Sequence, residues 1–244
     1  MIVLYVALGI IGLILGVLIL HVLFLAALSL FVRKKYYDKP SPLYRAAFAY
    51  VVRLAMFFCN IKIKVTGREK LTAIDGKCLF VGNHRSDFDP FVTLLGLKIK
   101  ELAFISKPEN FKIPIFGKIV RKCLYTDIDR ENAKNAIKTI NRTAELIQKD
   151  VVSYFVYPEG TRSKSARMLP FHDGVFKIAQ KAGAPIVVVG VRSTEKVHKN
   201  APWKKTVVYL DVLDVIDKET VSALSSHEIS GKAKETLILA TEGK

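Results

Sequence analysis

The first 32 residues carry no charged side chain, which limits where this segment can lie. As a helix rising 1.5 Å per residue it would reach ~48 Å, longer than the ~30 Å hydrocarbon core of a bilayer. A cleaved signal peptide is disfavoured because no positively charged stretch precedes the apolar run and the run is too long. The pattern predicts a retained membrane-anchoring helix over residues 1–32.

A basic cluster and a second apolar stretch follow this helix. Arg33, Lys34 and Lys35 come directly after it, and by the positive-inside rule they predict that the rest of the chain lies on the cytoplasmic face. Residues 46–59 are apolar but too short to span a bilayer comfortably. We expect them to lie in the membrane interface or to pack against the first helix. A first helix of the globular domain is an equal alternative.

Strand and helix patterns alternate from residue 61 onward. Residues 61–65 alternate apolar and basic side chains with period two, and apolar runs of strand length recur at 78–82, 102–106, 124–128, 151–157, 185–191 and 206–215. Helical patterns occur at 90–97, 114–122, 131–149, 173–181 (capped by Asp173) and 226–240. The order predicts an α/β domain with a mixed, largely parallel sheet flanked by helices and preceded by N-terminal membrane helices. The expected divisions are a membrane helix at 1–32, a basic linker and interfacial or packing helix at 33–60, and the α/β domain at 61–244.

Charge and cysteine content narrow the class of partner. The net charge is +16, from 38 basic and 22 acidic residues, which favours a polyanionic partner such as nucleic acid, an anionic bilayer or a phosphorylated substrate. Cys59, Cys78 and Cys123 stand far apart, with no CxxC motif and no neighbouring His. We therefore expect no metal site and no disulfide framework. This cysteine content is consistent with a protein that resides in a reducing compartment.

The stretch VGNHRSDFDP, residues 81–90, pairs a histidine with an acid. It follows an apolar strand pattern, and Asp89 before Pro90 predicts that a helix starts there, with Asp89 as its cap. Across such a corner the imidazole of His84 can fold back onto Asp89 and act as a general base with a fixed tautomer. In the alternative interpretation Asp89 is only a cap and His84 only a loop residue. Asp87 is a second candidate partner.

A second polar stretch, YPEGTRS at residues 157–163, also follows an apolar strand, where open α/β sheets bind ligands. Gly160 lets the backbone approach a ligand, and Arg162 offers a planar fork for phosphate oxygens. Glu159 can hold that guanidinium or accept a hydrogen bond from a substrate hydroxyl. The alternative is an ordinary turn with a surface ion pair. In SKPENFKIPIFG, residues 106–117, Lys107 either adds charge to an anion site or is a solvated surface lysine.

Four blocks together resemble one family. NHRSDFDP resembles the N-H-x-x-x-x-D signature of the glycerolipid acyltransferases, the family of 1-acylglycerol-3-phosphate acyltransferases, and YPEGTRS resembles its F-P-E-G-T-R-S block with Tyr157 for Phe. SKPENFKIPIFG resembles the block between them, and APIVVVGV the block after them. All four occur in the family's order over roughly residues 60–195. His172 and Asp173 depart from the pattern, since they stand where members often carry basic residues.

The resemblance implies an enzyme and assigns roles by position. A fatty acyl group would pass from acyl-CoA or acyl-acyl-carrier-protein, as co-substrate, to the sn-2 hydroxyl of lysophosphatidic acid, making phosphatidic acid at a membrane. His84 would be the base and Asp89 its partner. Contacts to the substrate phosphate would come from Glu159, Gly160 and Arg162, with help from Lys107. No metal or other cofactor is implied.

Three other functions remain open from the residues. The acceptor can instead be glycerol 3-phosphate or another lysophospholipid. Hydrolysis of a lipid ester would use Ser86, but no G-x-S-x-G elbow occurs in the chain. A non-catalytic membrane or nucleic-acid binder would explain the charge alone. We expect no nucleic-acid partner, because no nucleic-acid-binding signature is apparent.

Overall fold

The computed structural model describes residues 1–33, 35–129, 132–163 and 167–242; Lys34 of the predicted basic cluster and residue 131, the predicted start of a helix, lie outside these ranges. The α-helices are α1 Ile2–Leu30, α2 Pro42–Phe58, α3 Asp89–Leu97, α4 Phe116–Lys122, α5 Ala133–Gln148, α6 Lys177–Ala182, α7 Val197–Asn200, α8 Lys218–Ala223 and α9 Ser226–Thr241. The strands are β1 Ile61–Thr66, β2 Leu79–Gly82, β3 Leu102–Ser106, β4 Thr126–Asp127, β5 Ser153–Val156, β6 Ile186–Arg192 and β7 Thr206–Ile216. Short 3-10 turns occur at Arg68–Ala73, Pro108–Lys112, Asp173–Phe176 and Thr194–Lys196.

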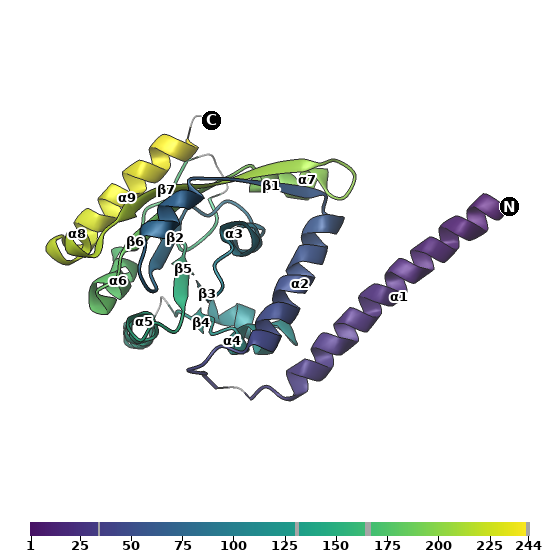
Figure 1. The fold of residues 1–244 in the computed structure, drawn as a ribbon, viewed down its shortest axis with the longest axis horizontal. Helices are drawn as coiled ribbons and strands as arrows, with labels where there is room; N and C mark the ends of the chain where they lie inside the picture. Colours follow the sequence, from purple (N-terminus) through teal and green to yellow (C-terminus); the bar gives the residue numbers. More distant parts are fainter. Residues whose placement is uncertain (34, 130–131, 164–166, 243–244) are drawn as a thin grey trace.

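The strands of the described residues form one seven-stranded sheet in the order β1-β7-β6-β2-β5-β3-β4 (Figure 1). Neighbouring strands are parallel except β6 and β7. The central strands β2 and β5 are buried along their whole length, as parallel strands covered on both faces should be. Edge strand β1 alternates half-buried and exposed positions, as its sequence predicts. The predicted mixed, largely parallel sheet is confirmed.

Helices cover both faces of this sheet (Figure 1). On one side α3 packs against β1 and β7, and α2 packs outside α3 and α4. On the other side α5 and α6 pack together, and α9 lies along β6 and β7. The core between these layers is built from the apolar strand residues. The helices do not cover the carboxyl ends of the central parallel strands, and these ends border a cavity.

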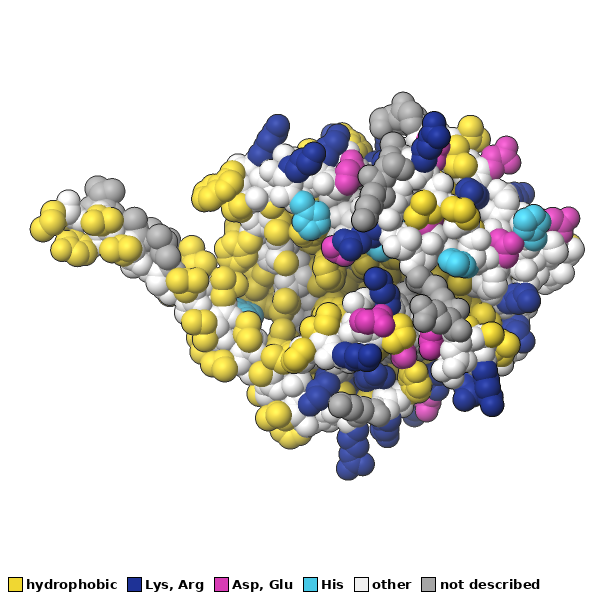
Figure 2. All heavy atoms as spheres, turned by 180° about the vertical axis from the view of Figure 1, so that it is seen from behind, with side chains coloured by type: hydrophobic (Ala, Val, Ile, Leu, Met, Phe, Trp, Pro, Cys, Tyr) yellow, Lys and Arg dark blue, Asp and Glu magenta, His cyan; other side chains and the backbone are white. Residues whose placement is uncertain are grey.

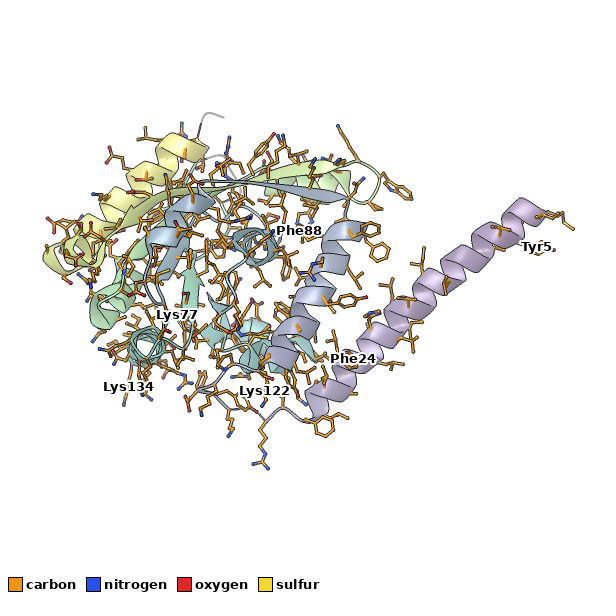
Figure 3. All side chains as sticks on the ribbon, in the orientation of Figure 1. Tyr5, Phe24, Lys77, Phe88, Lys122 and Lys134 are labelled. Carbon is orange, nitrogen blue, oxygen red and sulfur yellow. The ribbon has the colours of Figure 1, made fainter. Side chains whose placement is uncertain are left out.

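Helix α1 extends away from this domain (Figure 1). By length and composition Gly12–Leu30 can cross a membrane, with a mean hydropathy of 2.8 and 6% of the window buried. Its side chains, such as Tyr5 and Phe24, project into open space (Figure 3). The helix contacts the domain through its C-terminal third, where the His21 ring stacks on Tyr50 and the Leu28 carbonyl accepts from the Tyr44 hydroxyl at 2.9 Å.

Helix α2 lies against the domain. Tyr44, Phe48, Val52 and Met56 recur every four residues and form a buried stripe that faces α3 and α4. Of the alternatives left open by the sequence of residues 46–59, packing on the α/β domain is observed, and Tyr50 also stacks on His21 of α1; a position in the membrane interface stays a prediction. The opposite side of α2 stays exposed and faces the side from which α1 departs (Figure 1).

Two local predictions are wrong. The strand expected at 124–128 shrinks to Thr126–Asp127, because Leu124 adopts a left-handed φ of 66° that ends the turn after α4. Asp173 makes no capping hydrogen bond. Its carboxylate instead accepts from the His227 ring at 2.8 Å, and the segment opens with a 3-10 turn before α6.

Candidate active site

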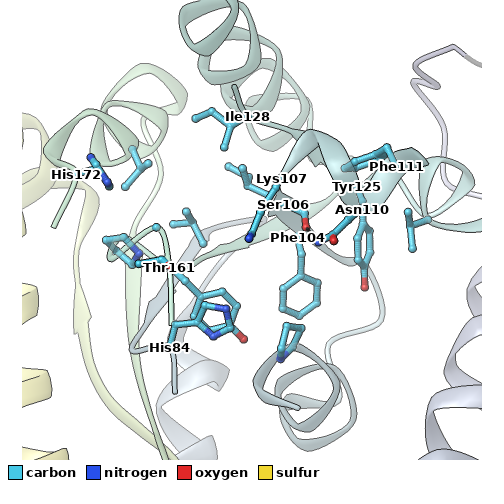
Figure 4. A pocket seen from close by; sticks show the side chains of 18 of the residues that line it. His84, Phe104, Ser106, Lys107, Asn110, Phe111, Tyr125, Ile128, Thr161 and His172 are labelled. Atoms are coloured by element: carbon cyan, nitrogen blue, oxygen red, sulfur yellow. Dashed lines mark hydrogen bonds between the residues drawn. The ribbon is translucent and has the colours of Figure 1, made fainter. Parts of the chain in front are cut away.

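The motif segments lie at the carboxyl ends of neighbouring parallel strands. β5 pairs in parallel with both β2 and β3, so the segments that follow these three strands reach the same edge of the sheet. A backbone hydrogen bond joins two of the segments, because the Ser163 N–H donates to the His84 carbonyl at 2.8 Å. Residues far apart in sequence therefore surround one cavity (Figure 4).

Gly82 and Asn83 set the direction in which the chain leaves β2. A Cβ on Gly82 would lie 2.7 Å from both the Phe155 ring and the Val189 carbonyl oxygen, so only glycine fits. The buried Asn83 side chain donates to the Val191 carbonyl and accepts from the Val191 N–H, both at 2.8 Å. The Asn83 side chain thus extends the hydrogen bonding between β2 and β6 by one residue. It fixes the position of the loop that begins at Asn83.

Replacing Asn83 with Ala is expected to destabilise the fold, because the Val191 N–H and carbonyl lose their buried partner. An unsatisfied buried group costs about 1–3 kcal/mol, so we expect a loss of roughly 2–5 kcal/mol in the free energy of unfolding. A denaturant titration in detergent measures it. Asn141→Ala, at an exposed position of α5, is the control and should change this free energy by less than about 0.5 kcal/mol. Equal stability of the two variants would contradict the role of Asn83.

The imidazole of His84 lines the cavity and is held by Asp89. Its Nδ1 lies 2.8 Å from Asp89 Oδ2. Since a carboxylate only accepts hydrogen bonds, Nδ1 carries the hydrogen and Nε2 keeps its lone pair. The side chain of His84 is 18% exposed, and that of Asp89 is fully buried. The ring is therefore a base with a fixed tautomer and an open face toward the cavity.

Asp89 is fixed by several donors. Oδ2 also accepts from the backbone N–H groups of Arg85 and Ser86, at 2.6 and 2.7 Å, and Oδ1 accepts from the Thr194 hydroxyl at 2.5 Å. The prediction that Asp89 caps α3 is wrong, because Phe88 occupies the cap position and Asp89 is the first helical residue. Its carboxylate turns back onto the loop that carries His84.

Asp87, the other candidate partner of His84, points elsewhere. Its carboxylate forms an ion pair with the Arg162 guanidinium, and its side chain is 62% exposed. The carboxyl group that contacts the imidazole is therefore that of Asp89. Asp87 lines the same cavity from the side of Arg162.

Tyr157 packs against one face of the His84 imidazole. Its ring stacks on His84 with centroids 4.4 Å apart and an interplanar angle of 20°. Its hydroxyl lies 3.3 Å from the Thr93 hydroxyl. Burial, reinforced by the charge of Asp89, raises the pKa of Tyr157 well above its usual value, so the phenol stays neutral. The stacking fixes the plane of the base without adding charge.

The expected contact between Glu159 and a substrate needs correction. The carboxylate is buried and does not line the cavity; Oε1 accepts from the His84 N–H at 2.7 Å and Oε2 from the Leu169 N–H at 2.9 Å. Burial raises the pKa of Glu159, while these two backbone donors oppose the rise. Glu159 therefore ties its own loop to the loop of His84 and leaves no oxygen turned toward a substrate.

The remaining candidates lie at the cavity mouth. Arg162, Lys107 and Gly160 all line it, and His84 and Lys107 both point into it (Figure 4). Gly160 has a left-handed φ of 74°, which favours glycine and turns the backbone inside the cavity wall. The mouth thus combines two cationic side chains with a close backbone approach, which suits an anionic group.

The cavity has a volume of about 810 Å³ and two chemically different parts. Its mouth holds charged and polar side chains. Behind it runs an apolar arm between β3, α4, α5 and α2, lined by Phe48, Phe104, Phe111, Phe116, Val120, Tyr125, Ala136 and Ile140. In Figure 4, His84 and Thr161 lie on one side and Phe111 and Tyr125 on the other. The volume falls within the ~300–1,000 Å³ typical of small-molecule sites.

Two further candidates have distinct positions. His172 and Asp173, which depart from the family pattern, line the same cavity. Ser86, the nucleophile of the hydrolase alternative, is buried and does not line the cavity; its hydroxyl accepts from the Phe88 N–H at 3.2 Å. A serine placed in this way supports the loop and presents no attacking oxygen.

Sequence reasoning missed the supporting residues Asn83, Tyr157 and Thr194. The sequence marks Tyr157 only as a replacement for Phe, and Asn83 only as the first residue of the NHRSDFDP block. Thr194 follows β6, whose sequence indicates a buried strand and nothing more. A usable signal is a polar residue within two positions of the end of a buried strand, where neighbouring strand ends converge.

The chain matches the acyltransferase family over residues 62–192, a range that includes His84, Asp89 and Arg162. The chain belongs to this acyltransferase family. A 1-acyl-sn-glycerol-3-phosphate acyltransferase of Salmonella typhimurium is 31% identical over 195 residues, which cover 77% of this chain and 78% of the relative. One of Haemophilus influenzae is 32% identical over 142 residues, 58% of each protein.

Other similarities are partial or structural. A chloroplastic 1-acyl-sn-glycerol-3-phosphate acyltransferase of Brassica napus is 37% identical over 136 residues, 56% of this chain. The chain spans only 39% of that relative's length and 37% of a similar Arabidopsis thaliana protein. The crystal structure of a 1-acyl-sn-glycerophosphate acyltransferase from Thermotoga maritima shares the fold, with a TM-score of 0.62, 24% identity and coverage of 89% of this chain and 86% of that one.

Proposed function

We propose that the chain transfers a fatty acyl group from a thioester to the sn-2 hydroxyl of 1-acylglycerol 3-phosphate and so makes phosphatidic acid. One observation carries the proposal. The His84–Asp89 pair opens into a cavity that has a cationic mouth and an apolar arm. A lysophospholipid has the same two chemical ends, and the names of the relatives give the same acceptor.

In this mechanism the His84 imidazole is the general base. Nε2 removes the proton of the acceptor hydroxyl as its oxygen attacks the thioester carbonyl carbon. The C–S bond then breaks, and the leaving thiolate takes the proton back from the imidazolium. Asp89 holds Nδ1–H and stabilises the transient positive charge. The thioester is already activated, so transfer needs no covalent acyl-enzyme.

The acceptor is oriented by its phosphate. Arg162 and Lys107 supply positive charge at the mouth, and the backbone at Gly160 allows close approach. Asp87 orients the guanidinium of Arg162 until the phosphate arrives. Holding the phosphate here presents the neighbouring glycerol hydroxyl to His84, while the acyl chain fits the apolar arm.

Attachment to a membrane is part of the proposal. Helix α1 exposes an apolar surface of spanning length, and Arg33 and Lys35 follow it. The positive-inside rule then puts the catalytic domain on the cytoplasmic face, where coenzyme A and acyl carrier protein thioesters are found. The lysophospholipid would enter the cavity from the membrane.

The function is tested by a panel of substrates on the purified full-length protein. Acyl-CoA and acyl-acyl-carrier-protein are offered as donors, with 1-acylglycerol 3-phosphate, glycerol 3-phosphate and lysophosphatidylcholine as acceptors. We expect the highest kcat/KM with 1-acylglycerol 3-phosphate. A preference for glycerol 3-phosphate would establish the alternative acceptor. Absence of transfer to every acceptor would reject the enzymatic proposal.

Replacing Arg162 with Ala is expected to lower kcat/KM for 1-acylglycerol 3-phosphate by roughly 10–100-fold, since a hydrogen bond to a charged group contributes about 1.5–3 kcal/mol. The loss should fall mainly on KM, because the arginine binds a phosphate that does not change during transfer. Arg53→Ala on the exposed side of α2 is the control and should change kcat/KM less than about threefold. Equal losses in the two variants would contradict phosphate binding by Arg162.

A further inference from the structure

The loop between α7 and β7 exposes the single tryptophan of the chain. Trp203 is 92% exposed, although it is the largest apolar side chain type. The segment 196–205 contains four lysines and no acidic residue. Lys199, Lys204 and Lys205 form no ion pair with any described residue. The catalytic cavity uses none of these side chains.

A second exposed aromatic group lies beside this loop. The Thr206 N–H at the end of the loop donates to the Asn60 carbonyl at 2.9 Å, directly after α2. Phe57 and Phe58 end that helix, with ring centroids 5.6 Å apart, and Phe57 is 75% exposed. The fold thus joins aromatic side chains from two distant parts of the sequence into one exposed region.

This region continues along the outer side of α2 toward α1. Leu43, Tyr50 and Phe57 are seven residues apart, so they share one face of the helix, and all three are exposed. The Tyr50 ring stacks on His21 of α1 with centroids 5.1 Å apart. Figure 2 shows apolar side chains gathered between α1 and the body of the domain. The α7–β7 loop projects on this same side in Figure 1.

We propose that Trp203 and its flanking lysines form a second membrane contact that rests in the interfacial layer of an anionic bilayer. Tryptophan favours this layer because its ring is apolar and its indole N–H still finds a polar partner. Lysines beside it are attracted to anionic headgroups. The patch lies on the same side of the domain as α1 and the exposed apolar face of α2, which indicates lipid as its occupant.

The two contacts lie at different positions along α2. Helix α1 contacts α2 at Tyr44 and Tyr50, whereas the loop of Trp203 joins the chain just after the C-terminal end of α2. A 17-residue helix is roughly 25 Å long, so the contacts are well separated. Two separated contacts restrict rotation of the domain about the membrane anchor, which a single helix cannot do.

Because Trp203 is the only tryptophan, emission excited at wavelengths that tyrosine does not absorb reports on this loop alone. The protein is reconstituted into vesicles of phosphatidylcholine with or without phosphatidylglycerol, and flotation confirms that it is bound. With anionic vesicles we expect emission shifted to shorter wavelength, quenching by lipids brominated on the acyl chain, and protection from iodide. Unshifted emission without bromine quenching in vesicle-bound protein would overturn the proposal.

Two charge-reversal variants sharpen the test. Lys204→Glu/Lys205→Glu is expected to lose most of the bromine quenching and of the dependence on phosphatidylglycerol. Lys181→Glu/Lys232→Glu, exposed on α6 and α9 away from α1 (Figure 1), should keep both. Equal quenching in the two variants would reject the role of the lysines. An acyl-transfer assay on the same preparations separates failure of this contact from failure of the proposed enzymatic function.

Discussion

Replacing His84 with Ala is expected to reduce acyl transfer about 10²–10⁴-fold, the usual contribution of a general base. This corresponds to roughly 3–5 kcal/mol of barrier. The acceptor hydroxyl would have to lose its proton to water, because Asp89 lies behind the ring and is fully buried. The loss should fall on kcat, since the side chains that bind the phosphate and the acyl chain remain. Initial rates with saturating 1-acylglycerol 3-phosphate measure it.

A control for this experiment lies in the same cavity. His172 also lines the cavity and is exposed, but it has no assigned part in proton transfer. His172→Ala should therefore change kcat less than about threefold. Thermal unfolding of both variants excludes loss of structure. Transfer at a near-normal rate by His84→Ala would refute the assignment of the base.

Replacing Asp89 with Asn is expected to lower kcat about 10²–10⁴-fold, by analogy with other imidazole–carboxylate pairs. An amide of the same shape can still accept from the backbone N–H groups of Arg85 and Ser86, but it carries no charge to stabilise the imidazolium. If its NH₂ group faces His84, the ring also takes the wrong tautomer. Rates and thermal unfolding, measured together, separate this electrostatic loss from loss of the fold.

Asp87→Asn is the control variant for Asp89→Asn, and it should lower kcat/KM by less than about tenfold. Asp87 is largely exposed and pairs with Arg162. Its replacement therefore changes the orientation of the guanidinium and leaves the contact between His84 and Asp89 intact. We expect this smaller effect in KM. A larger loss of kcat from Asp87→Asn than from Asp89→Asn would show that the wrong carboxylate has been assigned to His84.

Local patterns in the sequence were enough to predict the strands and the corner that brings His84 to Asp89. The strand β3 was predicted with its observed bounds, and Pro90 indicated the start of α3. These features are local. They depend on the periodicity of apolar residues in the strands, on the position of Pro90, and on the five-residue spacing of His84 and Asp89. The pair then follows from one strand-to-helix turn.

Long-range contacts could not be predicted in the same way. The hydrogen bonds from the His84 N–H to Glu159 and from the Thr194 hydroxyl to Asp89 span 75 and 105 residues. They depend on the order of strands in the sheet, in which β2 lies between β5 and β6. No periodicity encodes that order, so the local sequence around Glu159 predicts a contact with Arg162 or a substrate and not the observed bonds to backbone N–H groups. No local pattern marks Thr194.

The hydrogen bond from the His84 N–H to Glu159 limits which substitutions the two loops of the site can accept. Together with the Ser163–His84 bond, it joins the loop of His84 to the loop of Arg162 in the structure without a ligand. Such preorganisation spares the protein a closing motion. It also means that neither loop can be redesigned for another headgroup without disturbing the alignment of the other.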